Sequence, residues 1–202
     1  IGTDGITPLS QFTPEFPKQF FGVAYGTGTN SVTESTTLVP WPATGTWTVP
    51  PADIEDSWRL IGFDDSGWNS AQTGIGYGYS FPNFIGAGGD TISEMRGIAG
   101  SAYLRIPFDV DNPAEVVEMT LELFYEDGFA AYLNGELVAS ANLPDPLAFD
   151  SISTQRREIR DGDAMEIFPL DFAGKLRSGE NILAFQMLND STGSSDVLLI
   201  PK

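Results

Sequence analysis

The clearest alternation of apolar and polar residues lies in residues 119–143. Residues 121–125 repeat with a period of two, which predicts a β-strand with one apolar face. A second apolar run, residues 129–133, is followed by Asn134-Gly135. Because this dipeptide tolerates positive φ at both centres of a type I′ turn, it predicts a tight hairpin into a further strand. This part of the chain is therefore predicted to be a meander of antiparallel strands.

Shorter apolar runs on either side of the meander predict more strands. They lie within residues 41–51 and at 102–108, 167–170, 181–188 and 197–200. Two prolines close the first run, which favours an edge strand there. With 22 Gly and 14 Pro and no long amphipathic helical pattern, the composition favours strands joined by loops. We therefore predict an all-β fold, a jelly-roll β-sandwich of two antiparallel sheets.

The first 40 residues differ from the rest of the chain and are predicted to be an extended leader. They are rich in Gly, Thr and Pro, and Pro14 and Pro17 resist a helix among several aromatic residues. We expect the leader, residues 1–40, to be the end of a preceding module or a strand shared between subunits. Residues 41–202 are then the jelly roll. A start at Ile1 rather than Met indicates a processed or excised piece of a longer polypeptide.

Charge and composition exclude several classes of function. The chain carries 28 acidic and 10 basic residues, a formal net charge of -18, so neither nucleic acid nor an anionic membrane surface is an expected partner. No apolar run of about 20 residues is present, so no membrane insertion is expected. Histidine and cysteine are absent, which removes the usual general base near neutral pH and any thiol chemistry. Only paired carboxylates of the glycosidase kind remain as an enzymatic alternative, and we predict that the chain is not an enzyme.

Five segments resemble, in order, the galactose-binding-domain-like jelly rolls of large secreted bacterial proteins. They are FDDSGW at 63–68, TGIGYG at 73–78, SAYLRIPFDVDNP at 101–113, YEDGFAAYLNGELVASAN at 125–142 and GENILAFQMLNDSTGSSDVLLIP at 179–201. The leader sequence FTPEFPKQFFGVAYG resembles the junction that follows lamin-tail-like modules in planctomycete and verrucomicrobial multidomain surface proteins. The resemblance implies an extracellular or cell-surface module without catalytic activity, whose commonest ligand class is carbohydrate.

The glycine-rich stretch at residues 73–97 is the candidate binding site. A pyranose needs a flat aromatic face for its apolar side and polar groups for its hydroxyls. We predict as ligand-binding residues Tyr77, Tyr79, Phe81, Asn83, Phe84 and Arg96, with Asp90 and Glu94 as further polar groups. In the alternative interpretation, Tyr77 and Phe81 fold back over the edge of the sandwich and close its core.

Calcium is the metal that the acidic loops favour, since it binds carboxylate and carbonyl oxygens. The jelly rolls that this chain resembles often hold one structural Ca²⁺, and we expect no other cofactor. Asp64 and Asp65 are the candidate ligands, although both are better explained as turn residues that cap backbone amides.

Two functions follow from these observations. The first is a non-catalytic carbohydrate-binding or adhesion module of an extracellular bacterial protein, whose partners are carbohydrate or neighbouring modules of the same polypeptide. The second is a structural subunit or repeat of a cell-surface layer, sheath or filament, in which the leader mediates self-association by adding a strand to an exposed sheet edge. A plain spacer is a third interpretation.

Overall fold

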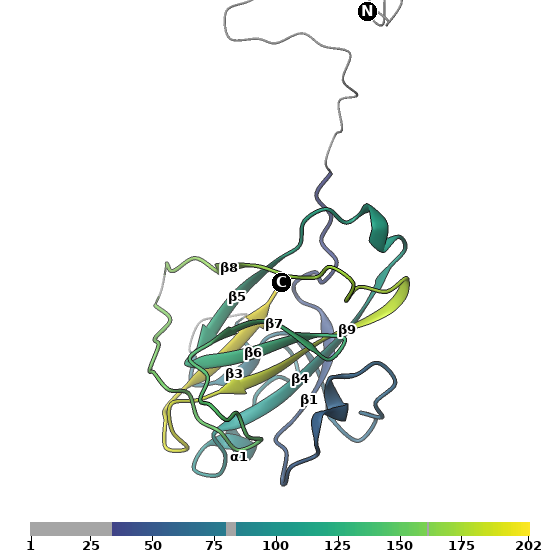
Figure 1. The fold of residues 1–202 in the computed structure, drawn as a ribbon. Coiled ribbons are helices and arrows are strands. Elements are labelled where there is room, and N and C mark those ends of the chain that lie inside the picture. The colour runs from purple at the N-terminus through teal and green to yellow at the C-terminus, as the bar shows by residue number, and fades with distance from the viewer. Residues whose placement is uncertain (1–33, 80–83, 161) are drawn as a thin grey trace, which may run out of the picture. The chain divides into compact units, whose positions relative to one another are not determined.

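Two antiparallel β-sheets pack face to face in the computed structural model, which describes residues 34–79, 84–160 and 162–202 (Figure 1). One sheet has six strands in the order β2-β1-β4-β9-β6-β7, and the other has four in the order β3-β10-β5-β8. The strands are β1 (Thr44–Thr48), β2 (Asn69–Gln72), β3 (Ile75–Tyr77), β4 (Ser101–Val110), β5 (Thr120–Glu126), β6 (Gly128–Leu133), β7 (Glu136–Ala141), β8 (Glu166–Pro169), β9 (Gly179–Leu188) and β10 (Val197–Pro201). The predicted all-β sandwich is thereby confirmed.

The helical segments among the described residues are single turns between strands. They are η1 (Asp56–Arg59), α1 (Ile92–Met95) and η2 (Pro113–Glu115). None of them forms a layer of its own, so the two sheets and their loops make up the fold.

The main core lies between the two sheets. Because successive side chains of a strand point to opposite faces, the alternation in the sequence places every second side chain there. The core side chains of the central strands are Ala102, Leu104 and Ile106 of β4, Leu183, Phe185 and Met187 of β9, Leu121, Leu123 and Tyr125 of β5, and Val197 and Leu199 of β10. Full burial of each large apolar side chain contributes about 2 kcal/mol.

A second apolar layer covers the outer face of the six-stranded sheet. Trp58 of η1 stacks on Tyr103 of β4 with ring centroids 3.9 Å apart. Beside this stack, Arg105 Nε donates to Asp65 Oδ2 at 2.7 Å, and Arg105 Nη1 donates to the backbone oxygen of Leu60 at 3.1 Å. The segment that carries Trp58 and Asp65 is thus fastened onto the sheet.

The Asn134-Gly135 turn joins β6 to β7 as predicted. Both residues have positive φ, 52° and 100°. The side chain of Asn134 also contacts β9, because its Nδ2 donates to Asn181 Oδ1 at 2.8 Å and its Oδ1 accepts from the Ile182 N–H at 2.8 Å. The hairpin is therefore held to the sheet by its turn as well as by its strands.

Two predictions about strands were wrong. β1 pairs with both β2 and β4, so the predicted edge strand lies inside the sheet, and its two prolines follow the strand. β3 lies in the stretch that was predicted to be a loop, where it pairs with β10. Gly76 in β3 has a φ of 147°, and a Cβ there would lie 2.1 Å from the backbone oxygen of Val197. This close approach requires glycine, which hides the strand from a search for alternating side chains.

The chain divides into two units, residues 1–36 and residues 37–202. Of the first unit, the structure describes only residues 34–36. The predicted boundary between a leader of residues 1–40 and a jelly roll of residues 41–202 stays a prediction. No helix in the described part of the chain has the length and apolar character needed to span a bilayer.

Candidate functional site at one end of the sandwich

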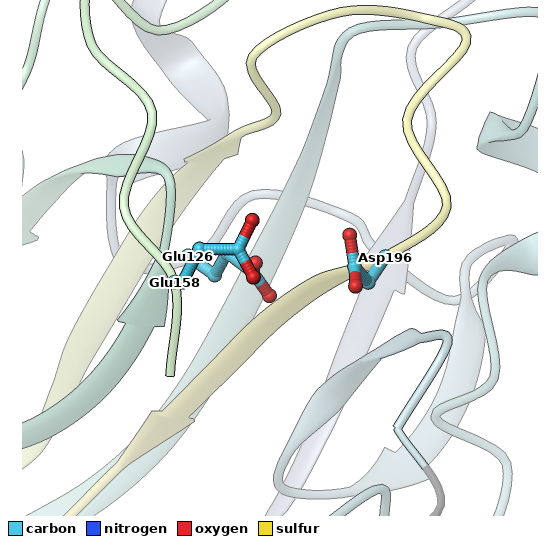
Figure 2. A group of neighbouring side chains, drawn as sticks. All are labelled: Glu126, Glu158 and Asp196. Carbon is cyan, nitrogen blue, oxygen red and sulfur yellow. The ribbon is translucent and has the colours of Figure 1, made fainter. Parts of the chain in front are cut away.

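Three carboxylates from distant parts of the chain meet at one end of the sandwich, and Figure 2 shows their oxygens directed toward one another. We call Glu126, Glu158 and Asp196 the acidic cluster. Glu126 ends β5, Glu158 lies in the loop before β8, and Asp196 precedes β10. One oxygen from each side chain lies within 4.8 Å of the other two. The pairing of β5 with β10 brings Glu126 and Asp196 together.

Glu126 is the buried member of the acidic cluster, with 1% of its surface exposed. Burial raises its pKa to about 8, a rise that the hydrogen bond from the Tyr79 hydroxyl opposes and the neighbouring carboxylates reinforce. Arg156 forms an ion pair with Glu158 at the exposed edge of the cluster. Within the described residues, Glu126 and Asp196 have no Lys or Arg partner in an ion pair. Among the residues that the structure places, none therefore supplies a cation to the buried side of the cluster.

The donor set of the acidic cluster fits calcium. Ca²⁺ takes six to eight oxygen ligands at about 2.3–2.6 Å, so two ligand oxygens on one ion lie at most roughly 5 Å apart. The cluster meets that limit and offers only oxygen atoms, which disfavours zinc and other metals that prefer nitrogen or sulfur. The three side chains could therefore hold one hard divalent cation.

The metal ligands predicted from the sequence, Asp64 and Asp65, are not part of this cluster. Asp65 Oδ2 accepts from Arg105 Nε and from Thr46 Oγ1, both at 2.7 Å, so the arginine already supplies its positive charge. Asp64 accepts from the backbone N–H of Ser66 at 3.1 Å, as a turn residue does. Both aspartates are engaged by other groups of the protein, and their assignment as calcium ligands stays a prediction.

The loop at residues 189–196 connects β9 to β10 and carries Asp196. Asn189 is fully buried at its start, where its Nδ2 donates to the Tyr77 hydroxyl at 3.0 Å and to the backbone oxygen of Asp196 at 3.1 Å. The N–H of Asp190 donates to Asp127 Oδ2 at 2.7 Å. Both ends of the loop are thus fixed from beneath by buried side chains.

The same loop forms one wall of a groove of about 550 Å³ at this end of the sandwich. Most of the lining is apolar: residues 49–51 after β1, residues 98–100 before β4, and Phe149 in the loop after β7. The polar lining comes from Ser101, Glu94, Asp150 and Thr192. The groove therefore combines apolar side chains with the oxygen atoms of four polar residues.

Buried polar side chains fix the walls of the groove. Gln186 Nε2 donates to the backbone oxygen of Ala148 at 2.7 Å, and the Ser101 hydroxyl donates to that of Phe149. On the opposite wall, the N–H of Gly97 donates to the backbone oxygen of Thr192 at 2.6 Å. A site built on such fixed backbone loses little conformational entropy when a ligand binds.

The predicted ligand-binding residues fall in three different places. Tyr77 is 1% exposed, and its hydroxyl donates to the backbone oxygen of Ser194 at 3.2 Å, so its ring belongs to the core, as the alternative interpretation has it. Tyr79 and Phe84 contact each other with ring centroids 6.2 Å apart, over the outer face of the four-stranded sheet. Arg96 is exposed just after α1. Phe81 and Asn83 lie outside the described residues.

Neither the acidic cluster nor the groove was found from the sequence. Glu126, Glu158 and Asp196 share no spacing or motif, and only the tertiary fold brings them together. Phe149 lies outside every motif and candidate site that the sequence analysis identified. Of the residues that line the groove, only Glu94 was a candidate ligand-binding residue in the sequence, and it was assigned there to the stretch at residues 73–97.

Neither a protein-family model nor a curated protein matches the chain. Among solved structures, the chain is similar to part of Bifidobacterium dentium β-glucuronidase complexed with coumarin-3-O-glucuronide, with 13% identity and a TM-score of 0.44 over 78% of this chain and 21% of that one. A glycosyl hydrolase family 2 member from Bacteroides cellulosilyticus gives 17% identity and a TM-score of 0.45, over 80% and 20%. A calcium-binding mutant of Bacteroides uniformis β-glucuronidase 2 gives 14% and 0.44, over 80% and 17%.

The chain spans about a fifth of the length of each of these glycosidases. These matches correct the prediction that the chain is not an enzyme, because the proteins that it matches in part are enzymes that act on carbohydrate. The similarity concerns the fold of one part of each glycosidase. Any activity of a longer protein that contains this chain is a proposal.

Proposed function

We propose that the sandwich is a saccharide-binding module and that the groove is its binding site. The observation that supports this proposal is the groove itself, in which apolar and polar side chains lie together and hydrogen bonds from Gln186 and Ser101 hold the backbone. A pyranose fits such a surface, because its C–H face packs on apolar rings while its hydroxyls need hydrogen-bond partners.

Each part of the groove has a role in this proposal. The rings of Phe149, Pro50 and Pro51 receive the apolar face of a sugar. The carboxylates of Glu94 and Asp150 accept hydrogen bonds from its hydroxyl groups. A mixture of this kind gives orientation as well as contact area.

The module belongs, in this proposal, to a longer extracellular protein that binds or processes carbohydrate. Residues 1–40 are its leader, and residues 41–202 its jelly roll. This part of the proposal is supported by the sequence resemblance to the jelly rolls of secreted bacterial proteins. The narrower resemblance to planctomycete and verrucomicrobial surface proteins stays a prediction, as does the structural-subunit function, which depends on a leader that is mostly outside the described residues.

We also propose that the acidic cluster binds one Ca²⁺. The support is the fit of its oxygen atoms to calcium and the absence of a protein cation from its buried side, among the residues that the structure describes. The ion would join Glu126 of β5, Glu158 of the loop before β8, and Asp196 of the loop that walls the groove. Calcium would thus stabilise the loops around the site rather than take part in binding the sugar.

Affinity gel electrophoresis against a panel of neutral and acidic polysaccharides tests the binding function. We expect at least one polysaccharide to retard the protein, and the Phe149→Ala variant to lose that retardation. Two matched variants remove an aromatic ring elsewhere: Trp41→Ala, at a ring that is 40% exposed in a smaller cavity beyond the other end of β1, and Tyr79→Ala, in the surface predicted from the sequence.

Three results would count against the proposal. If none of the polysaccharides retards the protein, the proposed binding function is wrong. Retardation that Phe149→Ala keeps and Trp41→Ala loses moves the site to the smaller cavity. Retardation that only Tyr79→Ala loses restores the surface of Tyr79 and Phe84 as the binding site.

A further inference from the structure

The charged groups of the groove all have the same sign. Glu94 lies at one wall and Asp150 at the other, and no Lys or Arg is among the described residues that line the groove. Asp150 is exposed, and Glu94 is half-buried, with its carboxylate accepting from the Ser93 hydroxyl at 2.6 Å. A ligand in the groove therefore meets two carboxylates and no cation.

None of the described arginines at this end of the sandwich is among the residues that line the groove. Arg156 pairs with Glu158 and lies 3.8 Å from Asp190. Arg157 donates to the backbone oxygen of Tyr125 at 2.6 Å. Arg96 follows Glu94 closely in the sequence, but it is not among the residues that line the groove. The net charge of the chain, -18, adds a field of the same sign as that of the groove.

We infer that the groove selects uncharged saccharides and rejects saccharides that carry uronic acids, an inference that rests on the proposed binding function. A sugar carboxylate in the groove would stand close to Glu94 and Asp150 without a counter-charge, and like charges at such distances repel strongly where water is partly excluded. A sugar hydroxyl at the same place donates a hydrogen bond to either carboxylate. The same two side chains thus attract one class of ligand and reject the other.

The experiment compares one polysaccharide in two charge states. A neutral mannan or glucan that retards the protein is used as it is and after oxidation of its C6 hydroxymethyl groups to carboxylates, which leaves its backbone unchanged. We expect the oxidised polymer to bind the wild-type chain at least about tenfold more weakly at low salt. In about 1 M NaCl, where the Debye length is about 3 Å, the difference between the two polymers should shrink.

Two double variants separate the groove from the charge of the whole chain. Glu94→Gln/Asp150→Asn removes both carboxylates of the groove, and we expect it to bind the oxidised polymer several-fold more tightly than the wild type does. Glu136→Gln/Glu180→Gln makes the same change in net charge at the first residue of β7 and near the start of β9, at the other end of the sandwich. We expect this control to reject the oxidised polymer as the wild type does.

Each outcome has a distinct meaning. Equal binding of both polymers by the wild-type chain at low salt overturns the inference and leaves the binding function intact. An equal gain by both double variants also overturns it, because the exclusion would then come from net charge alone. Retardation by no polysaccharide of either kind overturns the binding function, and the inference with it.

Discussion

Asp65 and Arg105 form an ion pair on the outer face of the six-stranded sheet, with Asp65 Oδ2 2.7 Å from Arg105 Nε. The side chain of Arg105 is 2% exposed and that of Asp65 is 29% exposed. Arg105 also donates to backbone oxygens of Trp58 and Leu60. The pair therefore fastens a loop to the sheet, and it uses a carboxylate that the sequence had suggested for calcium.

We expect the Asp65→Ala variant to lower the free energy of unfolding by about 2–3 kcal/mol. Removing the aspartate leaves a buried guanidinium without its counter-charge, and partial exposure of Asp65 keeps the loss below that of a fully buried pair. Urea unfolding followed by tryptophan fluorescence measures the change. The adjacent Asp64→Ala variant is the matched control, and it should stay within about 0.5 kcal/mol of the wild type. Equal losses in the two variants would show that the ion pair with Arg105 is not what holds this loop.

The stability that Asp65 provides should disappear in acid. Although partial burial opposes the change, hydrogen bonds from Arg105 and Thr46 lower the pKa of Asp65 below its ordinary value. A carboxylate with a lowered pKa in the folded state stabilises the protein above its unfolded pKa, about 3.9, and loses that contribution as the pH falls through the folded pKa. Unfolding measured from pH 7 downward should show the wild type and Asp65→Asn converging below about pH 4. A constant difference down to pH 2.5 would contradict the linkage.

Most strands of this protein could be predicted because their signals are local. The period of two in β5 and the Asn134-Gly135 turn each act within a few residues, and both are present in the structure. Arg105 shows the limit of this reasoning. Its position in the alternation of β4 points outward, which predicts exposure to solvent, yet a loop from residues 58–65 covers it. Only the tertiary fold decides whether an outward face is also buried.

The candidate sites could not be predicted for the same reason. Glu126 lies within a recognisable strand and turn, and its environment depends on Asp196, which the pairing of β5 with β10 brings beside it. The groove depends on the turn that carries Phe149, and a hydrogen bond from the buried side chain of Gln186 fixes that turn. Neither contact has a counterpart in periodicity or composition, because each joins residues that are distant in the sequence.

We expect the side chain of Asn134 to stabilise the hairpin as much as its backbone does. Asn134→Gly keeps the positive φ of 52° but removes the hydrogen bonds with Asn181 and Ile182, and should lower the free energy of unfolding by about 2 kcal/mol. Asn134→Ala loses the same bonds and adds the strain of a left-handed conformation, about 1 kcal/mol more. Thermal and urea unfolding of both variants measure which of the two loses more stability. A Gly variant as stable as the wild type would show that only the turn conformation matters.

Calcium should stabilise the chain through the acidic cluster. At a concentration about 100 times its dissociation constant, a cation that binds only the folded state adds about 2.7 kcal/mol, which raises Tm by several degrees. Glu158 is exposed, so Glu158→Gln should fold normally and lose the rise in Tm. Glu136→Gln, at an exposed position at the other end of the sandwich, should keep it. A Tm that is the same in Ca²⁺ and in EGTA would rule out the calcium site.

Gln186 should affect saccharide binding through the turn that it holds. Gln186→Met keeps the length of the side chain and removes the hydrogen bond to the backbone oxygen of Ala148, leaving Phe149 present but its turn less firmly placed. We expect the dissociation constant for the polysaccharide that retards the protein to rise about fivefold to tenfold. The free energy of unfolding should fall by about 1–2 kcal/mol. Gln155→Met makes the same chemical change at an exposed position and should alter neither quantity.

Isothermal titration at a temperature where all three proteins are folded separates affinity from stability. Wild-type affinity in Gln186→Met, together with loss of binding in Phe149→Ala, would show that the phenyl ring binds without help from the turn beneath it.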